Sequence, residues 1–188
     1  MNDTEILQRF ADTGALLEGH FKLRSGLHSD RFFQAALVLQ YTQTAAELCG
    51  ALAAHFSSAK IDTVISPAVG GIVVGQEIGR HLGTRAVFAE KEGADKLILR
   101  RGFHLREGER VLVAEDVITR GGRVQQTIDL VREHGATPVG VAVLVDRSTE
   151  TPDFGVPVQH LVQLKLATYS PENCPLCQRG VPLHRPGS

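Results

Sequence analysis

The chain has 188 residues, enough for one domain with a sizeable core and too few for two. Its 20 lysines and arginines nearly balance 21 aspartates and glutamates, which argues against a nucleic-acid or membrane surface and favours a small substrate. Three cysteines do not make a disulfide framework, and the sequence shows neither a signal peptide nor a membrane-spanning apolar run, so we expect a cytoplasmic protein.

The first forty residues are predicted to form a helix followed by a separate segment. Thr4 or Asp3 can cap the helix, whose apolar positions recur near helical spacing at Ile6, Leu7, Phe10, Leu16 and Leu17. Residues 19–39, which we call the hood, combine an arginine, a Ser-Gly turn and adjacent aromatic residues before an apolar strand expected to run through Leu39. Such a segment can cover a flat, polar ring, or it can be a solvated hairpin with a core aromatic residue. Its chemistry alone does not decide between the two.

The middle of the chain alternates helices and strands. A helix is predicted over 42–56, a strand over 63–66 and a second helix over about 72–82. Gly70 and Gly71 stand at the junction of that strand with the second helix. A glycine pair in this position can bring backbone amides onto a phosphate, or it can simply make a tight turn.

A charge-rich segment follows a further strand over 85–89. Residues 90–102 alternate charges, glycine and short apolar runs, which is typical of a mobile flap or a hairpin. The alternative is an ordinary solvated surface, which charge-rich loops usually form.

The most informative stretch is 110–123. Residues 111–114 are a short apolar run rich in β-branched side chains, as in a strand buried on both faces of a parallel sheet. Glu115 and Asp116 follow at once, at the carboxyl end of the strand, where open α/β sheets bind ligands. Thr119 and two glycines then form a small turn before a helix that begins near residue 124.

The chemistry of this turn favours an anion. Gly121 and Gly122 allow the positive φ angles at which successive amides converge on a phosphate, and the next helix offers unpaired N–H groups. The acidic pair repels phosphate, so it is better matched to ribose hydroxyls or to a metal ion that carries the phosphates. The stretch therefore predicts a site for a phosphorylated sugar, the alternative being a plain strand-turn-helix connection with acids facing water.

Beyond this stretch the alternation continues. The helix is expected to end near His134 and Gly135, and a buried strand over 138–145 ends in Asp146-Arg147-Ser148. Arg147 can be an exposed charge beside an acid, or its planar guanidinium can form two hydrogen bonds to a carboxylate.

Two cysteines mark the tail, at about 170–188. Cys174 and Cys177, with His184 downstream, have a spacing that invites a zinc site, but they supply three ligands where structural zinc usually takes four. Free thiols or a labile disulfide are the alternatives, and a site completed by other residues or shared in a dimer stays open. Cys49, on one face of the 42–56 helix, is most simply a core residue.

The stretch around the acidic pair resembles the phosphoribosyl-pyrophosphate (PRPP) signature of type I phosphoribosyltransferases: an apolar strand, two acids, two apolar residues, threonine and a glycine-containing turn. Glu115 stands where the family most often has aspartate. The resemblance implies that the acids position ribose hydroxyls and that 117–123 bind the 5-phosphate, with Mg²⁺ carried by PRPP. The implied PRPP contacts are Glu115, Asp116, Val117, Ile118, Thr119, Arg120, Gly121, Gly122 and Arg123.

The hood resembles the N-terminal segment of one branch of this family, the orotate phosphoribosyltransferases. The matching residues are Phe21, Leu23, Arg24, Ser25, Gly26 and Ser29, followed by Phe32 and Phe33. Arg24 stands where lysine is common, which preserves the charge and changes its geometry. The position of Arg147 also resembles an orotate-binding position. The resemblance implies an orotate site that includes Arg24, Phe32, Phe33, Thr119 and Arg147.

Residues 90–102 correspond to the lid loop of that branch, which begins Arg-Lys, later carries Lys and His, and reaches across a dimer into the neighbouring site. Sugar transfer develops a cationic sugar and a departing pyrophosphate, so a basic lid both excludes water and neutralises charge. Lys91 matches the lysine and is a further implied PRPP contact, whereas Glu90 replaces the arginine and the later Lys-x-His spacing is not recognisable. The candidates for pyrophosphate contact or for the missing charge are Gly70, Gly71, Lys96, Arg100 and Arg101.

We therefore expect one α/β domain over 1–188, with a central parallel sheet flanked by helices and an N-terminal helix and hood over about 1–40. The implied function is the transfer of the phosphoribosyl group from PRPP to orotate, giving orotidine 5'-monophosphate and pyrophosphate, in de novo pyrimidine (UMP) synthesis. The implied cofactor is Mg²⁺ and the implied assembly a homodimer with a shared lid. The alternatives are a purine or uracil phosphoribosyltransferase, which should lack the hood motif, and a non-enzymatic PRPP-sensing regulator on the same fold.

Overall fold

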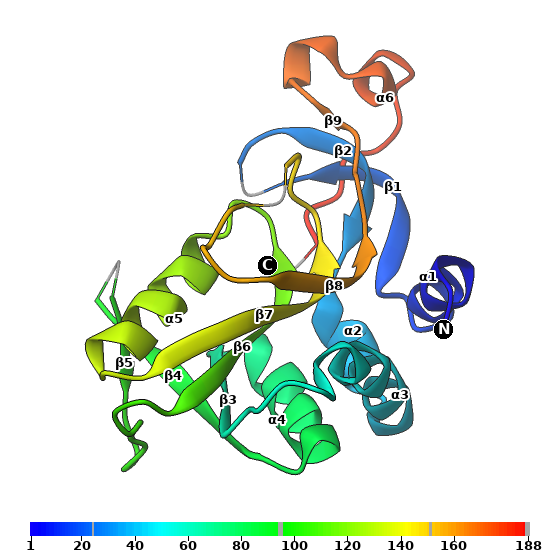
Figure 1. Ribbon diagram of the computed structural model, residues 1–188. Helices are drawn as coiled ribbons and strands as arrows, with labels where there is room; N and C mark the ends of the chain where they lie inside the picture. Colours follow the sequence, from blue (N-terminus) through cyan, green and yellow to red (C-terminus); the bar gives the residue numbers. More distant parts are fainter. Residues whose placement is uncertain (24, 94–95, 151, 187–188) are drawn as a thin grey trace.

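The computed structural model describes residues 1–23, 25–93, 96–150 and 152–186, and it contains two sheets (Figure 1). The main sheet has the strand order β5-β4-β3-β6-β7-β8. All its neighbouring strands are parallel except β5, which is antiparallel to β4. Its strands are β3 (Thr63–Pro67), β4 (Arg85–Glu92), β5 (Lys96–Leu99), β6 (Arg110–Ile118), β7 (Thr137–Asp146) and β8 (Val158–Gln163).

Helices cover both faces of the main sheet. On one face lie α2 (Ala35–Leu39), α3 (Thr42–Ala53), its extension η1 (Ala54–Phe56) and α4 (Gly71–Leu82), with α1 (Asp3–Asp12) packed beside them. On the other face lies α5 (Gly122–Glu133). Within the described ranges, every helix is too short or too polar to cross a bilayer.

The central strand β6 confirms the prediction of burial on both faces. Leu112 and Ala114 belong to the core under α3 and α4, whereas Val111 and Val113 belong to the core under α5. All four are fully buried. Because successive side chains of a strand point to opposite faces, a continuous apolar run is what this position requires.

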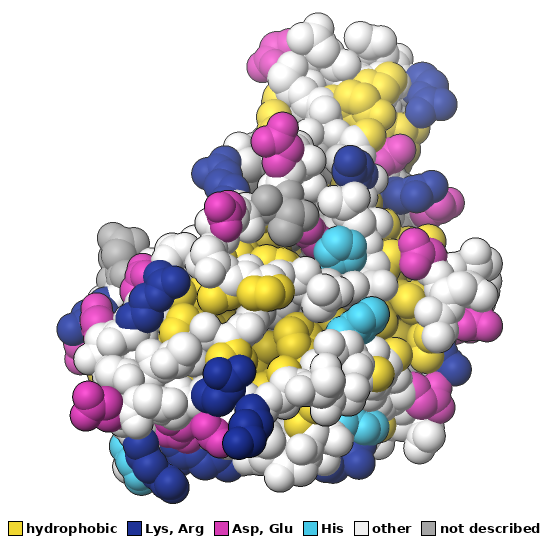
Figure 2. All heavy atoms as spheres, in the orientation of Figure 1, with side chains coloured by type: hydrophobic (Ala, Val, Ile, Leu, Met, Phe, Trp, Pro, Cys, Tyr) yellow, Lys and Arg dark blue, Asp and Glu magenta, His cyan; other side chains and the backbone are white. Residues whose placement is uncertain are grey.

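The hood forms a second, smaller sheet with part of the tail. It is built from β1 (Leu16–Lys22), β2 (His28–Phe33) and β9 (Thr168–Tyr169), all antiparallel, and is followed by η2 (Pro171–Asn173) and α6 (Pro175–Gln178). The tail then returns to the free edge of β1, where His184 N–H donates to the carbonyl of His20 (2.8 Å). In the space-filling view, hood and tail form a narrow projection above a broad body (Figure 2).

Three local predictions were wrong. The helix α1 is capped by Asn2, which makes a reciprocal capping box with Glu5, rather than by Thr4 or Asp3. The helix also ends at Asp12 and does not include Leu16 and Leu17, because the chain turns at Gly14 (φ +68°) and β1 begins.

The third error concerns residues 35–39, which form α2 instead of extending the strand to Leu39. Ala35, Val38 and Leu39 are buried at the i, i+3, i+4 spacing of a helix, so packing against α3 decides their conformation. The strands β8 and β9 carry no clear sequence pattern, and no prediction covered them.

Candidate functional site

A pocket of about 750 Å³ opens where β3 and β6 end. One wall is the predicted stretch itself, since all nine residues of 115–123 line the pocket. The opposite wall is the turn after β3, whose lining residues are Pro67, Ala68, Val69 and Gly70. Val124 and Gln126, which no motif marks, join the lining because α5 starts directly after the motif.

The acidic pair lies at the floor of this pocket. Glu115 is only 6% exposed, and its Oε1 accepts a hydrogen bond from the Asp116 N–H (3.0 Å), while Asp116 Oδ1 accepts from the Val117 N–H (2.8 Å). Burial, followed by the negative charge of Asp116, raises the pKa of Glu115 well above its ordinary value. The pair is therefore matched to groups that relieve its negative charge, namely hydroxyl donors or a cation.

The turn after β3 lies directly against the two acids. A Cβ atom on Gly70 would be 2.2 Å from Asp116 Oδ2, and one on Gly71 would be 3.1 Å from Glu115 Oε1. Any side chain at position 70 would therefore displace the Asp116 carboxylate. Of the two predicted glycines, only Gly70 lines the pocket, and Gly71 begins α4 behind it.

The wall formed by residues 115–123 ends in a turn suited to an anion. Gly121 has the left-handed conformation (φ +76°), and α5 begins at Gly122, so its first N–H groups have no partner within the helix. A Cβ on Gly121 would be 2.8 Å from Phe154 and 2.9 Å from Pro152. Thr119, exposed in the same turn, adds a hydroxyl.

Arg147 is held beside this pocket by the backbone. Its N–H donates to the carbonyl of Ile118, a pocket residue (2.8 Å), because β7 runs parallel to β6. The side chain is half-buried, and its buried Nε has no hydrogen-bond partner in the described part of the chain. Burial lowers the pKa of the guanidinium, although it stays a cation at neutral pH. A partly desolvated cation with an unpaired nitrogen is suited to an anionic ligand.

The hood aromatics divide between core and surface. Phe33 is buried and packs against Phe10, with ring centroids 4.8 Å apart, so its ring is part of the core. Phe32 is half-buried beside Phe21, with ring centroids 5.9 Å apart. The third hood candidate, Arg24, lies outside the described residues. Neither phenylalanine lines the pocket, and Phe32 is the less buried of the two.

The predicted flap is a β-hairpin. β4 continues past residue 89 to Glu92, and Lys91 is paired with Leu97 of β5; residues 94–95 lie outside the described ranges. Arg101 Nε lies 2.8 Å from Glu90 Oε1, and Arg100 Nη2 lies 3.5 Å from Glu92 Oε1.

The hairpin cations therefore fall into two groups. Both arginines are paired with acids, whereas Lys91 and Lys96 are exposed and make no ion pair with any described residue. None of these four cations lines the pocket.

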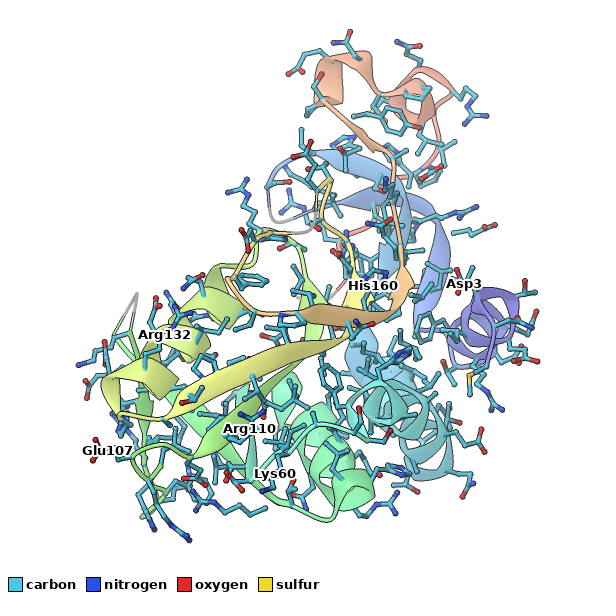
Figure 3. All side chains as sticks on the ribbon, in the orientation of Figure 1. Asp3, Lys60, Glu107, Arg110, Arg132 and His160 are labelled. Atoms are coloured by element: carbon cyan, nitrogen blue, oxygen red, sulfur yellow. The ribbon has the colours of Figure 1, made fainter. Side chains whose placement is uncertain are left out.

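A second pocket, of about 630 Å³, opens at the other end of the strands, where β3, β4 and β6 begin. Its central acid, Glu109, accepts a hydrogen bond from the hydroxyl of Thr63. It also forms an ion pair with Arg85, whose Nη2 lies 3.0 Å from Glu109 Oε1. Nearby, Arg110 Nε donates to the carbonyl of Lys60 (2.6 Å), and both residues lie at the edge away from the hood (Figure 3). These polar groups bond to one another, whereas the buried hydroxyl of Thr84 in the same pocket has no hydrogen-bond partner among the described residues.

Comparison with known proteins gives concordant results. Residues 38–154 match the phosphoribosyl transferase domain family. The chain is 50% identical over 188 residues to the orotate phosphoribosyltransferase of Desulforamulus reducens, covering 100% of this chain and 98% of that protein. It is also 50% identical to the enzyme of the same name from Chlorobaculum parvum, covering 100% and 97%.

A similar fold is seen in the crystal structure of orotate phosphoribosyltransferase from Aeropyrum pernix. The TM-score is 0.70 at 23% identity, covering 85% of this chain and 93% of that one. At this identity the likeness concerns the fold alone.

Proposed function

This chain belongs to the orotate phosphoribosyltransferases, and we propose that the 750 Å³ pocket is where the phosphoribosyl group of PRPP passes to orotate. The reaction gives orotidine 5'-monophosphate and pyrophosphate. The observation that carries the assignment is that a single pocket gathers the acidic pair, the glycine turn and the start of α5.

For PRPP, we assign the sugar to the acids and its phosphate to the turn. Carboxylate oxygens of Glu115 and Asp116 accept hydrogen bonds from ribose hydroxyls. Residues 117–123, with the free amides at the start of α5, bind the 5-phosphate. Since both walls are fixed by strands and helices, catalysis comes mainly from orientation and electrostatic stabilisation.

Magnesium fits the same pocket. Two adjacent carboxylates, one buried with a raised pKa, form a donor set whose repulsion a divalent cation relieves. Glu115 and Asp116 are the residues that would face the ion when it arrives with PRPP. Bound Mg²⁺ would neutralise the charge of the leaving pyrophosphate.

For orotate, Arg147 is the principal candidate. Its half-buried guanidinium, whose Nε has no hydrogen-bond partner among the described residues, offers two N–H groups to the orotate carboxylate. Thr119, on the neighbouring strand end, adds a hydrogen-bonding hydroxyl, and Phe32 is the hood ring proposed to stack on the base. The pyrimidine N1 then bonds to the anomeric carbon while the bond from that carbon to the pyrophosphate oxygen breaks and the N1 proton is lost to solvent, and no protein nucleophile is needed.

The hairpin supplies the lid. Lys91 and Lys96, both exposed and without an acidic partner among the described residues, are the cations we assign to the departing pyrophosphate. Because none of the described hairpin residues lines the pocket of its own chain, we propose that the lid serves the neighbouring site of a homodimer.

The deciding experiment is an ultraviolet assay of several bases with PRPP and Mg²⁺. We expect turnover of orotate and none of adenine, hypoxanthine, guanine or uracil. Turnover of a purine or of uracil without orotate would assign the pocket to another branch of the family. Calorimetry with PRPP and Mg²⁺ gives an independent check of the sugar-phosphate site, and no heat of binding would contradict its assignment.

A further inference from the structure

Four potential metal ligands converge between hood and tail, and none of them lines the 750 Å³ pocket. They are His20 of β1, His28 of β2, Cys174 at the start of α6 and Cys177 within it. Their ligand atoms all lie within 4.8 Å of one another. Figure 1 shows α6 at the top of the molecule, beside β1 and β2. Histidine nitrogen and cysteine sulfur in this number are the ligands of structural zinc.

We propose that His20, His28, Cys174 and Cys177 form a structural zinc site that joins the tail to the hood. His20 Nε2 lies 3.0 Å from His28 Nδ1, 3.5 Å from Cys174 Sγ and 3.7 Å from Cys177 Sγ, and the last sulfur is 3.3 Å from His28 Nδ1. Tetrahedral zinc with ordinary bond lengths would set edges of about 3.3 Å between two nitrogens and about 3.6 Å between nitrogen and sulfur. These four of the six spacings match the expected edges to within a few tenths of an ångström, and the other two are no longer than 4.8 Å.

The second ring nitrogen of His20 fixes the tautomer that a metal needs. His20 Nδ1 lies 2.8 Å from the carbonyl oxygen of Val181, and only a protonated Nδ1 can make this hydrogen bond. The lone pair is then on Nε2, which faces the other three ligand atoms. A backbone acceptor behind a metal-binding histidine is a common feature of zinc sites.

Hydrogen bonds alone do not account for this arrangement. Nε2 of a neutral imidazole has one lone pair, yet three potential donor atoms approach it within 3.7 Å. Three of the four side chains, those of His20, His28 and Cys174, are buried, so donors left without an acceptor would be costly. A cation at the centre satisfies all four ligands at once.

The site differs from the one that the tail sequence suggests. His184 is exposed and contributes backbone hydrogen bonds to β1, while its ring lies 6.5 Å from that of Phe21, outside the cluster. The hood supplies two histidines in its place, so the ligand count rises from three to four. With all four positions filled by protein, the site is closed, which is the mark of a structural rather than a catalytic zinc.

The first test measures the metal content of the purified protein. The full chain, without a polyhistidine tag and purified under reducing, chelator-free conditions, should contain about one zinc per chain by plasma mass spectrometry. Cys174→Ser and His28→Asn should each lose the metal. Cys49→Ala and His184→Asn are matched controls that should keep it, because Cys49 is buried in α3 and His184 lies outside the cluster.

A second test needs no substitution and so does not depend on the variants' folding. Zinc is removed from the wild-type protein with a chelator, and Co²⁺ is titrated back. A tetrahedral site with two thiolates should give visible absorption that saturates at one equivalent, is displaced by Zn²⁺ and accompanies recovery of the melting temperature.

Three results would overturn the proposal. The first is a wild-type protein that contains no zinc and gains no Co²⁺ spectrum. The second is a disulfide between Cys174 and Cys177 in protein isolated without reductant, with no metal bound. The third is loss of metal in His184→Asn together with its retention in His28→Asn, which would refute the ligand assignment.

Discussion

Gly70, on the turn after β3, lies directly against the carboxylate of Asp116, near the end of the neighbouring strand β6. A Cβ atom on Gly70 would be 2.2 Å from Asp116 Oδ2, closer than any real contact. The position of the carboxylate that we assign to ribose therefore depends on the absence of a side chain at residue 70.

Gly70→Ala should weaken PRPP binding without unfolding the protein. Gly70 has an α-helical conformation at the start of α4, so alanine fits the backbone, but its methyl group must push the Asp116 carboxylate aside. Overpacking of this kind costs about 1–3 kcal/mol. Steady-state kinetics should show KM for PRPP rising roughly tenfold, in line with about 1.4 kcal/mol, with a smaller change for orotate. An unchanged KM for PRPP would remove Asp116 from the ribose site.

The two glycines of the phosphate turn should respond differently to alanine. Gly121→Ala forces an alanine into the left-handed backbone conformation, which costs about 1–2 kcal/mol of stability. It also places a methyl group 2.8 Å from the Phe154 ring. Gly122→Ala is the matched control, because its Cβ meets nothing within 4 Å and it lies in a helix, where alanine is favoured by about 1 kcal/mol. Thermal melting should show a lower Tm for the first and an equal or higher Tm for the second. Equal losses in both would contradict this account of the turn.

Arg147→Ala should separate the two substrates. Loss of a charge-assisted hydrogen bond costs about 1.5–3 kcal/mol, so we expect KM for orotate to rise roughly 10- to 100-fold and KM for PRPP to change little. Arg147→Lys should be intermediate, since it keeps the charge and loses the planar fork. Arg132→Ala, an exposed arginine on α5, is the control and should change neither constant. Equal weakening of both substrates by Arg147→Ala would refute its role.

Glu115→Gln should raise the thermal stability of the protein and lower its activity. Burial raises the pKa of Glu115, so its contribution to stability is present below the ordinary glutamate pKa and is lost as pH rises through the raised value. Glutamine removes that loss, and at neutral pH the variant should melt higher, by about 2–4 °C for each 1 kcal/mol gained. The difference should shrink as pH falls toward about 4. Meanwhile kcat/KM for PRPP should fall. A difference in Tm that does not vary with pH would contradict the assigned cause.

Mixed dimers can test whether the lid acts across the interface. Lys91→Ala removes one of the two lid cations and Asp116→Asn disables the pocket, so each variant alone should have much reduced activity. In a mixed dimer, the Lys91→Ala subunit keeps an intact pocket and receives an intact lid from its partner. With random pairing, coexpressed variants should regain about a quarter of wild-type activity. No recovery in demonstrably mixed dimers would show that the lid serves its own chain.

Sequence reasoning succeeded where the determinants are local. The burial of β6, the acidic pair and the glycine turn are encoded within residues 111–122, and all of 115–123 line one pocket. The hood was harder to predict, because long-range packing decides its details. The burial of Phe33 depends on Phe10 from α1, and α2 exists because its apolar residues face α3.

The four proposed metal ligands are a further case in which long-range contacts cannot be predicted from local sequence patterns. His20 lies 154 residues before Cys174, and no spacing in the sequence relates them. The elements that bring them together are short as well, since β9 has two residues and α6 has four. Elements of that length carry no hydrophobic period to detect.

The pairing of β1 and β2 with the tail also bears on the order in which the molecule is made. Both strands leave the ribosome long before β9, which completes the edge of β2, and before His184, which covers the edge of β1. A nascent chain that has reached only its middle therefore carries a two-stranded hairpin with both edges open. A strand pair synthesised before the whole main sheet is therefore completed only after it.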